Sequence, residues 1–341
     1  MGGTVLYTSL ADLDQHDTGS WHPERASRLP AVDEAVTDPD IAQALSSFEP
    51  RQASIDELAK AHDRQHLTQV EDFISRGGGE IDADTQTSAG SWETARWAAG
   101  SGLAAIAALD RGEGDAAFVN IRPPGHHATA DQAMGFCIIN NVAVAAASLA
   151  ERGERVAIFD WDVHHGNGTQ DIFFNDPRVL YASTHEHPQY PGTGRAHEIG
   201  EGDARGLTVN VPLPSRTTGH LALRAFEEVI GPAIEEFAPS WLLISAGYDA
   251  HRADPLAGLE WTSGDYSALT SLVQQAGPGP GRTVVFLEGG YDLGALTSSV
   301  RSTLATLADL DHDPEPTSAA GHGEEAVAAA KRFRQRALDG G

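Results

Sequence analysis

The chain has 341 residues, of which 40% are hydrophobic, and its 23 basic and 49 acidic side chains give a formal net charge of −26. Such a negative charge repels phosphate, so it disfavours a general binder of nucleic acid or anionic membrane but is compatible with a small basic ligand. The single cysteine, Cys137, excludes an internal disulfide and a four-cysteine zinc module.

Short apolar runs alternate along the chain with longer segments rich in alanine, leucine and glutamate. The short runs predict seven buried strands, at Thr4–Thr8, Ala116–Ile121, Arg155–Phe159, Val179–Ser183, Leu207–Val211, Trp241–Ser245 and Thr283–Leu287. The longer segments predict helices at Trp92–Leu109, Asn140–Arg152, His220–Phe237, Ser263–Gln275 and Leu293–Leu310. This alternation is typical of a mainly parallel sheet covered on both faces. Ligands of such sheets bind beyond the carboxyl ends of the strands, where we therefore expect the chemistry.

Potential metal ligands follow two of the predicted strands. Asp162 and His164, in the run DWDVHHGNG after the third strand, are two residues apart and so point to the same side in extended backbone, as does Asp160. Asp249 follows the sixth strand. Two carboxylates and one imidazole leave an open position, as in hydrolytic zinc sites. An isolated D-x-H is more often a pair of loop residues bonded to backbone, but the strand-end position and the third candidate favour a metal site.

Two further runs contain groups suited to proton transfer and to oxyanion stabilisation. In Arg122–His127 (RPPGHH) prolines and glycine can shape the backbone around two adjacent histidines, which titrate near neutral pH. In Glu288–Tyr291 (EGGY) two glycines can project Tyr291 into a cleft as an oxyanion donor. The alternative for the two histidines is that they are solvated or bind a metal. The alternative for Tyr291 is that it belongs to the core or to a lid. Together with the metal ligands, these runs predict metal-assisted hydrolysis of an amide.

At these residues the chain resembles the zinc-dependent histone deacetylase and acetylpolyamine amidohydrolase superfamily. The matching pieces, in the family's order, are His22–Arg25, Arg122–His127, Gly135–Cys137, Asp160–Gln170, Gly192–Gly194, Gly247–Leu256 and Glu288–Tyr291. Asn167, in place of aspartate after HHG, makes the chain similar to the class II branch and its prokaryotic relatives. The resemblance implies a three-layer α/β/α arginase/deacetylase fold with a central eight-stranded, mainly parallel sheet. We expect the deacetylase catalytic domain to span residues 1–310, followed by an acidic segment and a C-terminal helical tail over 311–341.

The resemblance also implies the roles of individual residues. One zinc ion per chain would be held by Asp162, His164 and Asp249. His127 would act as general base and acid, oriented by Asn167, with His126 as its electrostatic partner bonded to Asp160. Tyr291 would stabilise the oxyanion. The family also binds potassium, and the matching residues are Asp160, Asp162, His164, Ser183 and Thr184 for an inner site and Phe173, Asp176 and Val179 for an outer site.

The implied reaction is hydrolysis of N-acetyl-lysine or a similar linear N-acyl amine. Phe136, beside Gly135, matches one aromatic wall of the family's substrate tunnel, and Tyr190 is the candidate for the other. Leu256 falls where polyamine-selective members carry glutamate, so it favours an acyl-lysine over the alternative, an acetylpolyamine or another small N-acyl amine. A metal-binding acyl-group reader without turnover is disfavoured, because Tyr291 and both histidines are present.

The expected location and partners follow from what the sequence lacks. No run of about 18 apolar residues marks a membrane span, and no basic segment followed by an apolar stretch opens the chain. We therefore expect a cytoplasmic protein that binds neither nucleic acid nor membrane, and that exists as a monomer or an oligomer.

Overall fold

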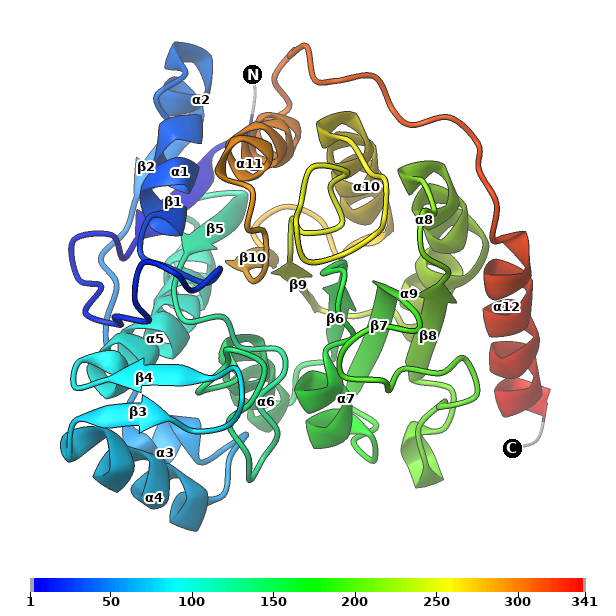
Figure 1. Ribbon diagram of the computed structural model, residues 1–341. Coiled ribbons are helices and arrows are strands. Elements are labelled where there is room, and N and C mark those ends of the chain that lie inside the picture. The colour runs from blue at the N-terminus through cyan, green and yellow to red at the C-terminus, as the bar shows by residue number, and fades with distance from the viewer. Residues whose placement is uncertain (1–2, 340–341) are drawn as a thin grey trace.

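The computed structural model, which describes residues 3–339, is built around one eight-stranded sheet (Figure 1). Every neighbouring pair of strands is parallel, in the order β2-β1-β5-β10-β9-β6-β7-β8. The strands are β1 (Val5–Ser9), β2 (Leu45–Ser47), β5 (Ala116–Asn120), β6 (Val156–Asp160), β7 (Val179–Glu186), β8 (Thr208–Leu213), β9 (Trp241–Ala246) and β10 (Thr283–Leu287). The expected parallel eight-stranded sheet is thus confirmed.

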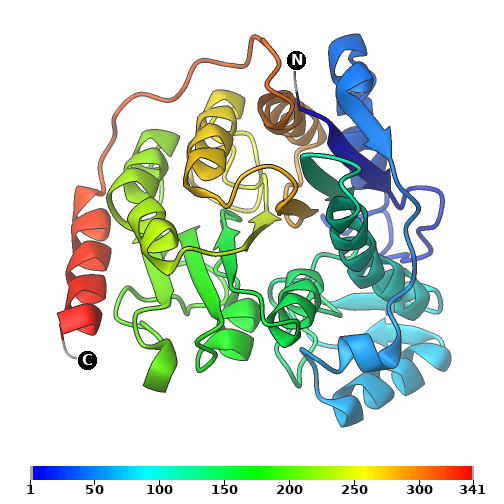
Figure 2. The ribbon, with the colours of Figure 1, turned by 180° about the vertical axis from the view of Figure 1, so that it is seen from behind.

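Helices cover both faces of the sheet, which gives three layers (Figures 1 and 2). One layer contains α5, α6 and α7, and the opposite layer contains α1, α8, α9, α10 and α11. The helices are α1 (Arg28–Ala35), α2 (Pro39–Ala44), α3 (Ile55–Leu58), α4 (Arg64–Ser75), α5 (Ser91–Asp110), α6 (Asn141–Glu151), α7 (Asn167–Phe173), α8 (Gly219–Ala225), α9 (Gly231–Phe237), α10 (Ser263–Ala276), α11 (Leu293–Leu307) and α12 (Glu324–Asp339).

The central strands are buried along their whole length. All residues of β6 (VAIFD), β9 (WLLISA) and β10 (TVVFL) are buried, which explains why the sequence shows continuous apolar runs rather than an alternating pattern. The register places Asp160, the last residue of β6, beside Ser245 of β9 and Ser183 of β7. The segments that leave β5, β6, β9 and β10 therefore start from one edge of the sheet.

Several elements differ from the predicted ones. The edge strand β2 was not predicted because it has only three, partly exposed residues, and neither was the short antiparallel pair β3 (Gly78–Glu80) and β4 (Gln86–Ser88). The helix predicted over His220–Phe237 is divided by a π-helical turn (η2, Phe226–Ile230). Pro232 follows this turn, and since proline has no N–H and its ring crowds the carbonyl four residues before it, the α-helical ladder cannot run through unchanged.

The C-terminal segment crosses from α11 to the far edge of the sheet, where α12 lies along β8 (Figure 1). Glu315 holds the crossing segment down: its carboxylate bonds Nε2 of His251 at 3.0 Å, pairs with Arg252 and accepts from the N–H of Ser263. The covered edge strand is protected from pairing with other chains.

Within residues 3–339 no helix is both long and apolar enough to cross a membrane.

His62 is a buried histidine that the fold holds neutral. Its Nδ1 is 2.8 Å from the carbonyl oxygen of Thr129, to which it donates, and its Nε2 accepts from the N–H of Asn140 at 2.9 Å. Burial and the nearby His66 lower the pKa of His62 from 6.5 to about 4. The unfolded chain therefore binds more protons than the folded chain between these two values, so stability is full above pH 6.5 and is lost as the pH falls toward 4.

We expect this histidine to contribute roughly 3 kcal/mol to the acid-induced loss of stability. Urea unfolding of the wild type and of His62→Gln at several values between pH 7 and pH 4 measures that loss. The variant should be less stable at pH 7 but show a smaller decline on acidification. Equal declines in the two proteins would contradict the assignment.

Candidate active site

Two carboxylates and an imidazole converge where β6 and β9 end. Nδ1 of His164 lies 3.1 Å from Oδ1 of Asp162 and 3.2 Å from Oδ2 of Asp249, and one donor atom from each residue falls within 4.8 Å of the others. The N–H of Val163 donates to Oδ1 of Asp249 at 3.0 Å, and the N–H of Gly289 donates to Oδ2 of Asp162 at 2.8 Å. Backbone of the segments that follow β6 and β10 thus orients both carboxylates.

This donor set fits a divalent cation. Oδ2 of Asp249 is buried and has no hydrogen-bond partner among the described residues, so an acceptor is left over at the point of convergence. A Cβ at Gly247 or Gly289 would clash with the carboxylates of Asp162 or Asp249, so these glycines leave room for them. Burial alone would lower the pKa of His164, but Asp162 and Asp249 raise it to about 10, which shows that the site attracts positive charge. Two carboxylates and one imidazole are a donor set that suits zinc.

His127 is held as a neutral imidazole with a defined tautomer. Its Nδ1 is 2.8 Å from Oδ1 of Asn167, and the amide nitrogen of Asn167 donates to the carbonyl oxygen of His127 at 3.3 Å. Because the amide oxygen faces the ring, Nδ1 carries the proton and Nε2 is left as the proton acceptor. Burial and the charges of His126 and His164 lower the pKa of His127 well below its usual value. The arrangement suits a general base.

The adjacent His126 has the opposite protonation preference. Its Nδ1 is 3.0 Å from Oδ2 of Asp160, whose Oδ1 accepts from the N–H of Asp162 at 3.1 Å. Burial would lower the pKa of His126, but Asp160 and Asp162 raise it to about 10. The two neighbouring rings, 4.0 Å apart between centroids, are therefore a charged and a neutral imidazole.

Tyr291 lies on the loop that leaves β10, and this loop is held at several points. Oδ2 of Asp254 accepts from the N–H of Tyr291 at 2.6 Å. Nε of Arg28 donates to the carbonyl oxygen of Gly290 at 2.8 Å, and its guanidinium lies 5.0 Å from the centroid of the tyrosine ring. Burial raises the pKa of Tyr291 well above 10, although Arg28 opposes this. The phenol therefore keeps its proton and can donate it in a hydrogen bond.

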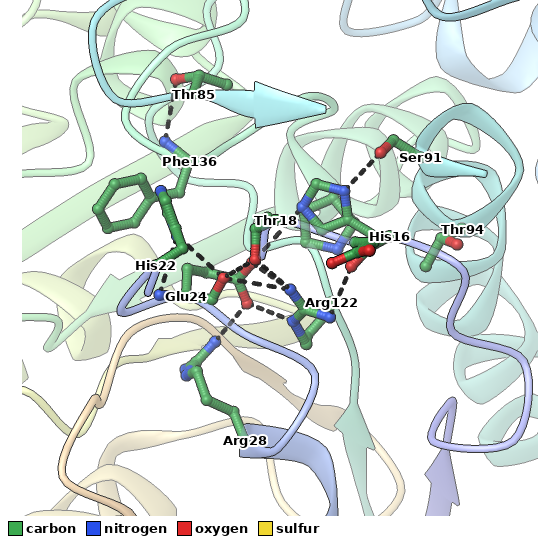
Figure 3. Close-up of polar contacts among 12 residues, drawn as sticks. His16, Thr18, His22, Glu24, Arg28, Thr85, Ser91, Thr94, Arg122 and Phe136 are labelled. Atoms are coloured by element: carbon green, nitrogen blue, oxygen red, sulfur yellow. Dashed lines mark hydrogen bonds and ion pairs between the residues drawn. The ribbon is translucent and has the colours of Figure 1, made fainter. Parts of the chain in front are cut away.

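A buried ion network fixes Arg28 (Figure 3). The carboxylate of Glu24 accepts from Nη1 of Arg28 at 3.1 Å and from Nε and Nη2 of Arg122 at 2.5 and 2.7 Å. Burial acts to raise the pKa of Glu24. Arg122, His16 and Arg28 outweigh it, so the pKa lies well below its usual value. Since Arg122 opens the RPPGHH turn, the network joins the early part of the chain to the histidine turn and to the Tyr291 loop. The sequence contained His22–Arg25 as a matching piece but did not indicate this function.

A cavity of about 200 Å³ brings these groups together. It is lined by Asp84, Pro124, His126, His127, Gly135, Phe136, His164, Gln189, Tyr190, Leu256, Gly289 and Tyr291. The ring of Tyr190 stands perpendicular to that of His127, with centroids 5.0 Å apart, and Phe136 meets Tyr291 edge-on at 5.9 Å. The ring of Phe136 also meets that of His22 edge-on, with 4.6 Å between the ring centroids (Figure 3). All four residues predicted for the tunnel, Gly135, Phe136, Tyr190 and Leu256, therefore lie in this wall.

Gly135 is required beside His127. Its φ is +58°, and a Cβ there would lie 2.5 Å from Cδ2 of His127. A side chain would both strain the backbone and displace the imidazole.

Asp84 is a wall residue that the sequence did not reveal. It belongs to the turn between β3 and β4, and its carbonyl oxygen bonds Nε2 of His22 at 3.1 Å. Only its place in a D-x-D turn could have marked it. Burial and the negative charge of the nearby Asp82 raise the pKa of Asp84 above its usual value.

The residues predicted for potassium lie in two groups. The inner group, Asp160, Asp162, His164, Ser183 and Thr184, lies at the ends of β6 and β7, where Oγ1 of Thr184 is buried and has no hydrogen-bond partner among residues 3–339. The outer group, Phe173, Asp176 and Val179, forms the connection from α7 to β7. In it the carbonyl of Phe173 accepts from Asp176, and that of Asp176 accepts from Val179.

Comparisons with known proteins agree on one family. Residues 22–307 match the family described as "Histone deacetylase domain". A "Probable deacetylase" of Archaeoglobus fulgidus is 39% identical over 87% of this chain and 84% of that protein. A "Histone deacetylase-like amidohydrolase" of Pseudomonas aeruginosa is 39% identical over 76% of this chain and 73% of that protein. The solved HD domain of HDA15 is 33% identical, with a TM-score of 0.89 over 98% of this chain and 95% of that one.

Proposed function

The chain belongs to the histone deacetylase family, and from this premise we propose that it hydrolyses N-acetyl-lysine or a similar linear N-acyl amine. One observation carries the proposal: a single cavity is lined by the neutral His127, by the protonated phenol of Tyr291 and by His164 of the metal-ligand set. A base, an oxyanion donor and a cation site within one small cavity are the groups that amide hydrolysis needs.

Asp162, His164 and Asp249 would hold one zinc ion, which when bound supplies a Lewis acid for the acyl oxygen and lowers the pKa of a water. Nε2 of His127 removes a proton from the attacking water as the new carbon–oxygen bond forms. The hydroxyl of Tyr291 donates a hydrogen bond to the acyl oxygen as negative charge develops on it.

Loss of the amine then requires a proton on its nitrogen. The imidazolium of His127 supplies that proton as the carbon–nitrogen bond breaks, so the products are acetate and the free amine. His126, paired with Asp160, keeps its positive charge next to His127. That charge disfavours a long-lived imidazolium and so promotes the second proton transfer.

The two groups of residues matching potassium sites would bind K⁺ as structural ions. The orphaned Oγ1 of Thr184 supports the inner site, because a buried hydroxyl without a partner is costly unless an ion or water uses it. Carbonyl oxygens on the connection from α7 to β7 would supply most of the outer site, and oxygen ligands suit a hard cation.

The wall of the cavity favours a lysine-like substrate while leaving a second candidate. Phe136, Tyr190 and Leu256 give apolar surface suited to a methylene chain. The carboxylate of Asp84 favours the second candidate, an acetylpolyamine, because it can pair with a distal ammonium.

Release of free amine from an N-acetyl-lysine peptide and from N-acetylputrescine by the zinc-loaded protein tests the proposal and separates the two candidates. We expect turnover of the peptide to be faster, and Tyr291→Phe to lower its kcat by about 100- to 1000-fold, the usual cost of losing one oxyanion donor. Tyr7→Phe, which removes from β1 the phenol hydroxyl that donates to Asp33 of α1, is the matched control and should leave kcat unchanged. Faster turnover of N-acetylputrescine would favour the second candidate, and no turnover of either would refute both.

A further inference from the structure

We propose that Glu288 is a positioning residue, whose buried carboxylate fixes the turn bearing His126 and His127 relative to the loop bearing Tyr291. The kinetic test of this inference rests on the proposed function, whereas its structural test by hydrogen exchange does not. Glu288 neither lines the cavity nor belongs to the metal-ligand set, so the reaction described above makes no use of it.

The side chain of Glu288 bonds the histidine turn directly. It is fully buried at the end of β10, and its Oε2 accepts from the N–H of Gly125 at 2.6 Å and from the N–H of His126 at 3.2 Å. Its Oε1 accepts from the hydroxyl of Ser245 on β9 at 3.2 Å. One carboxylate at the end of β10 therefore connects the turn after β5 to β10 and to β9, its neighbour in the sheet.

The main chain around Glu288 is held to the other reacting groups. Its carbonyl oxygen accepts from Nη2 of Arg28. Nε of the same arginine donates to the carbonyl of Gly290, and its Nη1 donates to Glu24. The next residue, Gly289, donates its N–H to the metal-ligand carboxylate of Asp162. The proton-transfer turn, the metal-ligand carboxylate and the tyrosine loop thus meet at this one residue.

Among residues 3–339, Glu288 is the acceptor for the N–H groups of both Gly125 and His126. The turn is closely packed at Gly125, because a Cβ there would lie 2.5 Å from the backbone nitrogen of Asn141. Removing the carboxylate would leave two neighbouring N–H groups buried without a partner, which costs more than the bonds themselves contribute and drives the turn to move. A displacement of about 1 Å in a catalytic group can lower the rate roughly 100-fold. Glutamine keeps an oxygen at the same reach, whereas alanine does not.

Kinetics of the zinc-loaded full-length enzyme on an N-acetyl-lysine peptide provide the first test. We expect Glu288→Ala to lower kcat by about 30- to 100-fold while KM changes less than about threefold and bound zinc stays at one per chain. Glu288→Gln should retain kcat within about fivefold. A kcat unchanged in Glu288→Ala, or a loss that appears in KM alone, would overturn the proposal.

Asp265→Ala is the matched control, because Asp265 is also a buried carboxylate that accepts backbone N–H bonds, from Thr262 at 2.8 Å and Ser318 at 2.9 Å, but lies outside the cavity wall. It should lower the melting temperature with kcat unchanged. If the two alanine variants lost kcat equally, the effect of Glu288 would be general destabilisation and the proposal would fail.

Amide hydrogen exchange gives a readout that needs no turnover. Peptides covering residues 122–128 should exchange at least about tenfold faster in Glu288→Ala than in the wild type, and remain protected in Glu288→Gln and Asp265→Ala. If the wild type hydrolysed no acylated amine while this pattern appeared, the proposed function would fail and the positioning role would stand. Unchanged protection in Glu288→Ala would refute the positioning role whatever the activity.

Discussion

Replacing Asp249 with alanine is expected to remove both bound zinc and activity. The variant lacks one of three converging ligands, and the two that remain come from a single segment, Asp162 and His164 on the loop after β6. We expect zinc to fall from about one ion per chain to less than about 0.1 at micromolar metal, and turnover to fall at least about 1000-fold. Metal content after gel filtration and release of amine from an acetyl-lysine peptide measure the two effects.

The same control separates metal loss from unfolding. Asp265→Ala also removes a buried carboxylate and should keep full zinc content. The assignment of Asp249 to the metal-ligand set would be wrong if Asp249→Ala bound zinc as tightly as the wild type, or if the control lost the metal to the same extent.

Replacing His127 with alanine is expected to give an inactive enzyme that still binds zinc. The residue takes up and releases a proton in the proposed reaction but is not a metal ligand, so kcat should fall by about 100- to 10,000-fold with one zinc retained per chain. Asn167→Ala should cost less, because the ring remains and loses only the acceptor at 2.8 Å that fixes its tautomer. Steady-state kinetics of the two variants test this order, and equal losses in both would contradict it.

His127 and Asn167 also determine how kcat/KM is expected to depend on pH. In the proposed reaction His127 acts as a base, which requires its neutral form, and burial with the charges of His126 and His164 holds its pKa well below 6.5. The acid limb of kcat/KM should therefore lie below pH 6.5 in the wild type. Asn167→Asp places a carboxylate beside Nδ1 and favours the imidazolium, so its acid limb should move to higher pH. A shift in the opposite direction would argue against His127 as the base.

The central strands could be predicted because the sheet buries them on both faces. β10 (TVVFL) and β9 (WLLISA) read as uninterrupted apolar runs between helical segments, and the structure places both inside the parallel sheet. Edge and peripheral elements lack that signal. β2 has only three residues, of which Leu45 is half-buried and Ser46 and Ser47 are exposed. β3 and β4 contain glycine and polar residues, so neither period nor hydrophobicity distinguishes these strands from loops.

The same distinction between buried strands and irregular segments decides which site residues could be predicted. Asp162, His164 and Asp249 were predictable because they follow buried strands directly, and parallel strands end at one edge. Asp84 and Arg28 were not, since Asp84 lies in a turn and α1, which begins at Arg28, follows an irregular segment. No local pattern specifies the path of either segment. Arg28 in particular opens α1, and only the folded chain reveals that its guanidinium bonds the carbonyls of the tyrosine loop.

The position of β10 affects how this protein can be made. It is the last strand of the sheet to leave the ribosome, yet it lies in the middle, between β5 and β9. Until about residue 287 has emerged, two apolar edges that later pair with β10 stay open to any other extended chain. Interrupted synthesis should therefore yield insoluble fragments rather than partly active ones, and chaperone dependence during translation should end abruptly once β10 is inserted.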